Sequence, residues 1–238
     1  MSLREVVAAP EAKHQYARRL FATIADRYDL ITVVLSYGRD RAWKRRLVRM
    51  AQVRPGLRVL DLATGTGDIA YLLHDAGAHV VGLDFTERML HLARRKRTGQ
   101  SGPVFLAGDM GALPFADASF DLITTGYGLR NVPTLTTAID EMARVLGPQG
   151  RVLSLDFNRP ANPVVRSAYL LYLSIVGGAL GWLLHRDPDT YRYIPASMSH
   201  YPGAEGVARL FCARGFGQAR WFRVLGGLMA IHDARRSA

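Results

Sequence analysis

A glycine-rich stretch followed by an aspartate is the strongest sign of chemistry in this sequence. Gly65-Thr66-Gly67-Asp68-Ile69-Ala70 satisfies the pattern G-x-G-x-x-A, in which the glycines let backbone approach a ligand and the next helix presents its amides. Asp84 stands near the spacing expected of an acid that binds a ribose. These residues predict a site for an adenosine-containing cofactor, and the pattern fits a nicotinamide enzyme and an S-adenosylmethionine (SAM) enzyme alike.

Two further aspartates separate these cofactors. Asp61 precedes the turn, where a carboxylate can pair with an amino-acid ammonium, which nicotinamide cofactors lack. Asp109 follows the third predicted strand and is placed for the exocyclic amine of an adenine. We therefore expect SAM as the cofactor. The residues expected to bind it are Asp61, Ala63, Gly65, Thr66, Gly67, Asp84, Phe85, Asp109, Met110 and Gly126.

The elements that must position these residues alternate between strands and helices. This alternation predicts an α/β fold with a mainly parallel sheet and helices on both faces. Ligands of such sheets bind at the carboxyl ends of the strands, where the aspartates fall. The predicted strands are Leu57–Leu62, His79–Asp84, Pro103–Asp109, Phe120–Thr125, Gly150–Asp156, Ala219–Val224 and Leu228–Ile231. The helices predicted among them are Asp68–Ala76, Thr86–Arg97, Thr134–Leu146 and Ala204–Ala213.

Two sections interrupt the alternation. The N-terminal section predicts a loose tail over residues 1–10, helices over Glu11–Ile24 and Asp40–Met50, and an irregular stretch over Ala25–Leu30. The second section contains Ala168–Leu184, 17 residues without a charge. They predict a buried or interfacial helix rather than a membrane span, and a lid over an apolar substrate is one such arrangement. The expected divisions are a helical N-terminal lid (1–55), a SAM-binding core (56–160), an apolar helical insertion that caps the substrate (161–203) and the C-terminal part of the same sheet domain (204–238).

Composition limits the function classes. A chain of 238 residues that is 49% hydrophobic suits one domain with a substantial extension. The single Cys212 excludes a disulfide framework and a cysteine-based zinc cluster, and we expect no metal. We see no signal peptide at the N-terminus and expect a cytoplasmic protein. The net charge is +11, with twelve Lys/Arg against five Asp/Glu in residues 1–55, so an anionic membrane surface is a candidate peripheral contact. A homodimer is left open.

Several motifs together resemble those of one enzyme family. Val59–Asp68 resembles the first motif of class I SAM-dependent methyltransferases. A narrower likeness, over about residues 15 to 232, is to the ubiquinone/menaquinone biosynthesis C-methyltransferases. The stretches that carry it are Phe21–Leu30, Leu35–Gly38, Trp43-Lys44, Gly108–Phe115, Gly126–Val132, Asp187–Tyr193 and Tyr201-Pro202.

The resemblance implies a Rossmann-like, seven-stranded, mostly parallel sheet with one antiparallel strand, and transfer of the SAM methyl group to a ring carbon of a polyprenyl hydroquinone. Such a carbon becomes nucleophilic beside a phenolate, and because phenols have a pKa of about 10, a base or a cation is needed nearby. Arg130 is expected to stabilise the phenolate and Asn131 to orient its oxygen. Tyr28 is expected to close the site and His200 to assist.

The sequence departs from the family pattern at three places, one of which is the unusually apolar 168–184 helix, and these keep alternatives open. Met110-Gly111 replaces the usual Ala-Glu, and Gly126 stands where the family often has serine. A methyltransferase for another hydrophobic acceptor, such as a polyketide or lipid, is therefore the main alternative. A nicotinamide oxidoreductase and a non-enzymatic, membrane-associated scaffold are the others. We expect no nucleic-acid partner, because cytosine-C5 chemistry needs a cysteine nucleophile and Cys212 lies in a late helix.

Overall fold

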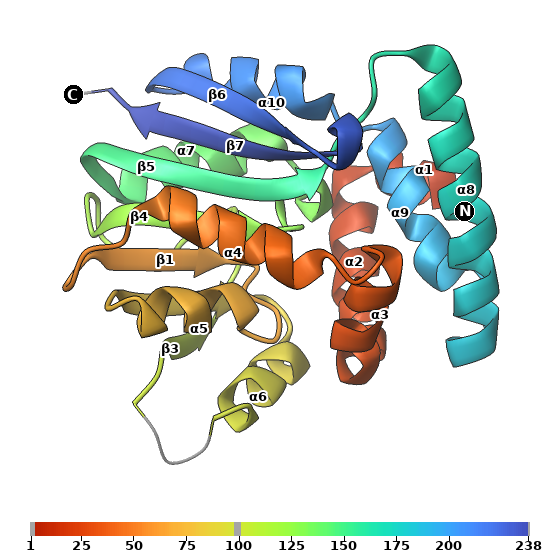
Figure 1. Ribbon diagram of the computed structural model, residues 1–238, viewed down its shortest axis with the longest axis horizontal. Coiled ribbons are helices and arrows are strands. Elements are labelled where there is room, and N and C mark those ends of the chain that lie inside the picture. The colour runs from red at the N-terminus through yellow and green to blue at the C-terminus, as the bar shows by residue number, and fades with distance from the viewer. Residues whose placement is uncertain (1–2, 98–100, 238) are drawn as a thin grey trace.

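A seven-stranded sheet with strand order β3-β2-β1-β4-β5-β7-β6 forms the centre of the computed structural model, which describes residues 3–97 and 101–237 (Figure 1). All neighbours from β3 to β5 pair in parallel, and β7 runs antiparallel to both β5 and β6. The predicted sheet with one antiparallel strand is therefore confirmed. The strands are β1 (Arg58–Leu62), β2 (His79–Asp84), β3 (Val104–Ala107), β4 (Phe120–Gly126), β5 (Leu146–Phe157), β6 (Phe216–Val224) and β7 (Met229–Arg236).

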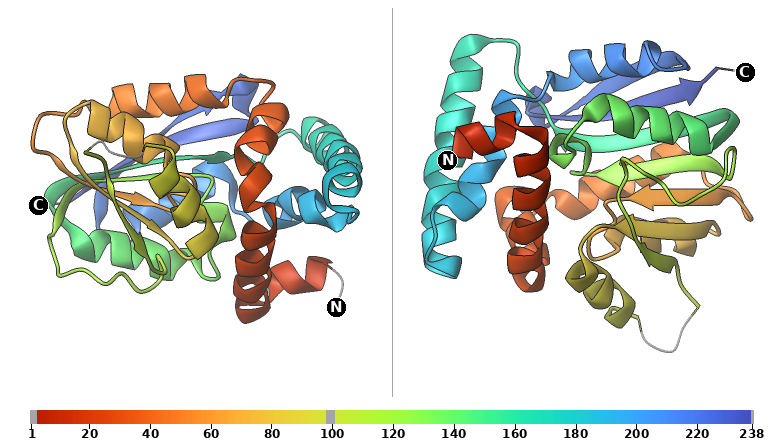
Figure 2. Two further views of the ribbon diagram at one scale, coloured as in Figure 1. Left: turned by 90° about the horizontal axis from the view of Figure 1, so that it is seen from below. Right: turned by 180° about the vertical axis from the view of Figure 1, so that it is seen from behind.

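Helices cover both faces of the sheet (Figure 2). Successive residues of a strand point to opposite faces, and β1 shows the consequence. Val59 packs with Leu47 and Leu73 from the helices of one face, whereas Leu60 packs in the cluster of the other face. The first face carries α4 (Asp40–Ala51) and α5 (Asp68–Asp75), and the second carries α7 (Leu135–Val145) and α10 (Gly203–Cys212); α6 (Glu87–Arg95) lies between β2 and β3 in the chain.

Helices from two distant parts of the chain gather at the carboxyl ends of the parallel strands (Figures 1 and 2). Aromatic packing joins them, because the rings of Tyr16 and Tyr193 stack with centroids 5.4 Å apart. The N-terminal section and the apolar insertion therefore form one cap over the strand ends. Its elements are α1 (Leu3–Ala8), α2 (Pro10–Ile24), the 3-10 turn η1 (Ala25–Arg27), α3 (Tyr28–Leu35), α8 (Pro163–His185) and α9 (Asp189–Ser199).

Two local predictions for the N-terminal section are wrong. Residues 3–8 form helix α1 rather than a loose tail, and Val7 is buried in one cluster with Tyr191 and Tyr193 of α9. Residues 25–30 are helical in η1 and the start of α3 rather than irregular. A six-residue helix has little stability of its own, so distant packing, which leaves no local sequence pattern, supports α1.

Candidate functional site

The turn between β1 and α5 brings backbone to the edge of the sheet. Gly65 and Gly67 have φ values of 55° and 83°, which favour glycine. A Cβ on Gly67 would lie 2.9 Å from Cζ of Phe105, so this position also requires glycine for space. The same atom on Gly65 would meet only Tyr28, at 3.7 Å. Gly67 thus fixes the turn, while Gly65 faces the cap.

Asp84, at the end of β2, binds two backbone amides, one in the glycine turn and one just after β2. Its carboxylate accepts hydrogen bonds from the Gly65 amide at 2.8 Å and the Thr86 amide at 2.9 Å. Burial raises the pKa of Asp84 to about 6, and these hydrogen bonds act in the opposite direction. Each carboxylate oxygen keeps acceptor capacity, so Asp84 can still receive two ligand hydroxyls.

Asp61 lies beneath the turn rather than on a cavity wall. The hydroxyls of Thr64 and Thr124 each donate to its carboxylate at 2.6 Å, and the residue is 1% exposed. Burial raises the pKa of Asp61 to about 6. The ammonium contact predicted for Asp61 stays a prediction, since its carboxylate lies beneath the turn and accepts two hydroxyls there. Its buried charge would still be stabilised by a cationic ligand nearby.

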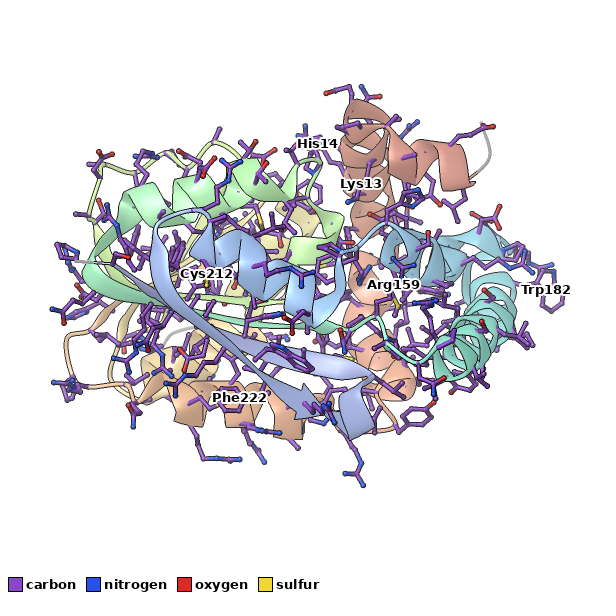
Figure 3. The ribbon with its side chains drawn as sticks, turned by 90° about the horizontal axis from the view of Figure 1, so that it is seen from above. Lys13, His14, Arg159, Trp182, Cys212 and Phe222 are labelled. Atoms are coloured by element: carbon purple, nitrogen blue, oxygen red, sulfur yellow. The ribbon has the colours of Figure 1, made fainter. Side chains whose placement is uncertain are left out.

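A cavity of about 650 Å³, counting its open mouth, lies above the turn; we call it the turn cavity. The glycine turn and two aspartates from neighbouring strand ends line it, so it is the candidate cofactor site. Near its wall, the His14 Nδ1 atom of α2 lies 3.4 Å from a carboxylate oxygen of Asp109, and Figure 3 shows His14 on the side of α2 toward the sheet. Of the predicted cofactor residues, the wall contains Ala63, Gly65, Asp84, Phe85, Asp109, Met110 and Gly126.

A second cavity, of about 810 Å³ with its mouth, lies between the cap and the strand ends; we call it the helix cavity. Its wall is mainly aromatic and aliphatic, and Arg130 is its one charged side chain within the described ranges. Phe21, Tyr28 and Tyr127 line both cavities. The two cavities therefore meet at this wall of three aromatic residues.

The shared wall is held from behind by buried polar groups. The Tyr127 hydroxyl donates to Asp40 at 2.7 Å, and Lys44 pairs with Asp40 at 2.6 Å. Burial raises the pKa of Tyr28 and that of Tyr127 far above the usual range of a phenol. Both hydroxyls therefore stay neutral and can orient a ligand but are poor bases at neutral pH.

Arg130 lies at the helix cavity with one side of its guanidinium occupied. Nε lies 3.4 Å from Asp156, and Nη1 donates to Asn131 at 3.1 Å and Ser197 at 2.8 Å. The guanidinium also lies over the Phe157 ring at 5.0 Å. No hydrogen bond within the described ranges uses Nη2, so a fixed cation with two spare donors lines an apolar cavity.

Comparison with known proteins agrees with this geometry. Residues 9–236 match the model of the ubiE/COQ5 methyltransferase family. The chain belongs to this family. It is 41% identical over 220 residues to a protein of Thermus thermophilus named demethylmenaquinone methyltransferase, covering 91% of this chain and 100% of the relative. A Staphylococcus aureus protein of the same name is 34% identical over 229 residues, covering 95% of each chain.

Solved structures share the fold of this methyltransferase. A SAM-dependent methyltransferase of Thermotoga maritima superposes with a TM-score of 0.67 at 17% identity, covering 92% of this chain and 99% of that one. The magnesium protoporphyrin IX methyltransferase of Synechocystis, with bound S-adenosylhomocysteine (SAH), has a TM-score of 0.58 at 18% identity and covers 83% of each chain. SAM is the cofactor of this family, and the glycine turn with Asp84 and Asp109 at one cavity fits it.

Besides Asp61, three predicted site residues of the methyltransferase lie away from the cavity walls. Thr66 binds Asp29 of the cap at 2.5 Å and accepts from Lys96 at 2.9 Å, and Gly67 shapes the turn. His200 is exposed at the end of α9, where Nδ1 lies 3.0 Å from the Ser199 hydroxyl. The structure does not bring His200 to the other predicted residues, because α9 points it to solvent.

Sequence reasoning assigned no site role to several residues that the fold brings to these cavities. Phe21 and Tyr127 lie within the motifs quoted above, but motif likeness does not show that they separate two cavities. His14 of α2 lines the turn cavity from a segment without a motif. The aromatic content of α8 and α9 was the available signal for Tyr169, Tyr172, Tyr191 and Tyr193, which line the helix cavity.

Proposed function

We propose that this methyltransferase transfers the SAM methyl group to a ring carbon of a polyprenyl naphthohydroquinone in menaquinone biosynthesis. One observation carries the proposal: a cavity built for a nucleoside meets an aromatic, apolar cavity at a shared wall of Phe21, Tyr28 and Tyr127. The curated relatives named demethylmenaquinone methyltransferase support this acceptor class. A flat aromatic ring with an isoprenoid chain matches the apolar wall of the helix cavity.

The residues at the meeting point have separate roles in this proposal. SAM supplies a methyl group activated by its sulfonium, so the protein must mainly align that methyl with a nucleophilic carbon. Arg130 stabilises the hydroquinone as its phenolate through Nη2. Asn131, which lines the turn cavity and accepts from Nη1 of Arg130, orients the oxygen from the cofactor side. Tyr28 separates the reacting groups from solvent. One phenolic proton leaves to water, and the new carbon–carbon bond forms as the carbon–sulfur bond breaks and SAH leaves. The methylated ring carbon then loses its proton and the phenolate oxygen regains one, so that each turnover releases one proton.

The remaining predicted residues hold SAM in this proposal. Asp84 accepts hydrogen bonds from the ribose, Asp109 accepts from the adenine amine, and Phe85 and Met110 supply apolar contact for the adenine. Gly65 and Gly126 give the cofactor close access to backbone. Asp61 supports the turn from below.

Activity of the purified protein tests the acceptor. Incubation with SAM and a chemically reduced demethylmenaquinone should give one added methyl group and one SAH for each product, detected by mass spectrometry. A cell lacking the gene should accumulate the demethyl quinone. Unchanged cellular quinones, with SAM still bound by the protein, would instead support an acceptor such as a polyketide or lipid.

We further propose that the acceptor reaches the helix cavity from a membrane surface. On α8, exposed apolar residues recur at helical spacing through Leu171, Ile175 and Trp182, which are each at least 61% exposed. Figure 3 shows Trp182 pointing away from the body of the molecule. The same helix is long and apolar enough to cross a membrane by length and composition, and 28% of its most apolar window is buried. We interpret it as an interfacial helix.

A second helix extends this apolar face to the cavity. Leu30 and Val34 of α3 are 57% and 45% exposed. Tyr37, just after α3, stacks on Tyr172 of α8 with ring centroids 6.1 Å apart, and both rings line the helix cavity. A membrane under this face would lie next to the cavity that we assign to the acceptor. Exposed Arg39 and Arg186 stand at the ends of the apolar segments, which suits an anionic surface.

Vesicle binding tests the membrane contact. The protein should co-sediment with vesicles that contain phosphatidylglycerol, and the double change Trp182→Ser and Leu183→Ser should reduce binding at least tenfold. Phe222→Ser is the control, because Phe222 is exposed on β6, outside α3 and α8. Equal binding by all three proteins would exclude this face as the membrane contact.

A further inference from the structure

The cap meets the loop of Arg130 through one lysine. The loop after β4 is fixed from inside, because Asp156 accepts from the Arg130 amide at 3.1 Å and the Asn131 side-chain amide donates to the Tyr127 carbonyl at 2.7 Å. From outside, Nζ of Lys13 on α2 donates to the Val132 carbonyl at 2.7 Å. This bond joins residues 119 positions apart in the sequence.

The lysine sits where a cation is costly. Burial lowers the pKa of Lys13 to about 8, the Arg130 cation also lowers it, and Asp156 acts in the opposite direction. The cations of Lys13 and Arg130 therefore both interact with the single buried carboxylate of Asp156. The half-buried ammonium keeps this position through its hydrogen bond to the Val132 carbonyl, so this bond is the contact whose role can be tested.

The next residue of α2 reaches the other loop of the turn cavity. His14 approaches Asp109 after β3, whereas Lys13 binds the loop after β4. Figure 3 shows His14 on the side of α2 toward the sheet, and the hydrogen bond to Val132 places Lys13 on that side too. Consecutive residues of one cap helix therefore hold the two loops that flank the turn cavity.

We propose that Lys13 is a positioning residue that fastens the α2 cap onto the Arg130 loop, so that the charged ammonium keeps the guanidinium and the shared aromatic wall in place for methyl transfer. This inference rests on the proposed function for its activity measurement but not for its structural measurement. Lys13 acts through Val132 and the loop, not through contact with the reacting atoms.

Hydrogen exchange of the SAH-bound protein tests the contact without any acceptor. Lys13→Met should increase exchange at least tenfold in residues 10–24 and 126–132 relative to wild type. Lys13→Arg should keep most of the protection, because it retains a charged donor. Arg18→Met is the matched control, since Arg18 is exposed on the same helix. Unchanged exchange in Lys13→Met would overturn the proposal, whether or not the protein methylates a hydroquinone.

The pH dependence of turnover then separates the charge from a merely structural role. The ratio of wild-type to Lys13→Met kcat should be about ten or more at pH 7 and should fall as the pH rises through 8, because the wild type loses its ammonium. Lys13→Gln, which keeps a neutral donor, should resemble Lys13→Met. A ratio that does not change between pH 7 and 9 would exclude the ammonium as the active group.

Discussion

At the scale of single residues, the site depends on buried charges with defined partners. Nε and Nη1 of Arg130 contact Asp156, Asn131 and Ser197, which fixes one edge of the guanidinium. A guanidinium fixed in this way can meet a developing phenolate without reorganising, which is where electrostatic catalysis gains most. The roles of Arg130 and Asp84 can therefore be tested separately, one on turnover and one on cofactor affinity.

Arg130→Lys should leave the SAM dissociation constant within about threefold of wild type and lower kcat by roughly 10²–10³-fold. Lysine keeps the charge but cannot bind Asp156, Asn131 and a phenolate at once, because its ammonium lacks the planar fork. Calorimetry with SAM and a hydroquinone assay measure the two quantities. Wild-type turnover would remove Arg130 from the mechanism.

SAM affinity should depend on the ionisation of Asp84. Because the pKa of Asp84 is about 6 and ribose hydroxyls donate to the ionised carboxylate, affinity should be constant between pH 7 and 8 and fall below pH 6. Protonation of one group can lower the SAM affinity by at most about tenfold per pH unit. Asp84→Asn should bind SAM more weakly at pH 7 and lose much of this dependence. A mutant with wild-type affinity at pH 7 would contradict the assignment.

At the scale of elements, the proposed function assigns the acceptor to the side of α8 and α9 and the cofactor to the side of the sheet and α5. Close packing joins the two cap helices, since a Cβ on Gly177 of α8 would lie 3.0 Å from the Tyr191 carbonyl of α9. Tyr191 and Tyr193 line the helix cavity, and neither lines the turn cavity. A disturbance at this helix contact should therefore affect the acceptor more than the cofactor.

Gly177→Ala should separate these two effects. The added methyl group meets backbone that cannot rotate away, so we expect a loss of stability of about 1–3 kcal/mol and a several-fold higher KM for the hydroquinone. SAM affinity should stay within about twofold. Ser167→Ala, at an exposed position of the same helix, should change neither quantity. Weaker SAM binding by Gly177→Ala would show that the two sides are not independent.

At the scale of the whole molecule, buried ionisable groups make stability depend on pH in opposing ways. His232 of β7 is 1% exposed, Nε2 lies 3.0 Å from the Ala204 carbonyl, and burial lowers its pKa to about 4. Between pH 6.5 and 4 the unfolded chain binds a proton at His232 that the folded chain does not, so acid destabilises the fold. Asp61 and Asp84 have raised pKa values and act with the opposite sign.

Comparing the unfolding free energies of wild type and a His232 mutant separates the contribution of His232 from that of Asp61 and Asp84. The stability of wild type relative to His232→Gln should be constant above pH 7 and decrease by about 3 kcal/mol as the pH falls to 4. Urea unfolding at each pH gives the two curves, and contributions shared by both proteins cancel. A pH-independent difference would mean that His232 has the same pKa in the folded and the unfolded protein, and would contradict the effect of burial.

The sequence by itself indicated the cofactor site and the alternation of strands and helices that builds the sheet. The glycine turn, the acids after β2 and β3 and the alternation of strands with helices are local patterns, because short segments must satisfy backbone geometry and expose one apolar face. Parallel strands then bring their carboxyl ends to one edge. Gly65, Asp84 and Asp109 could therefore be placed together before any coordinates were known.

Only the tertiary structure decided how the cap completes the site. It placed Asp61 under two threonine hydroxyls, turned His200 to solvent and brought Lys13 to Val132. It also paired Arg130 with Ser197, 67 residues away, and joined two cavities at three aromatic rings. Such contacts depend on which helix faces pack together across the strand ends. Burial between distant segments decides that packing, and neither segment alone carries a sequence pattern that shows it.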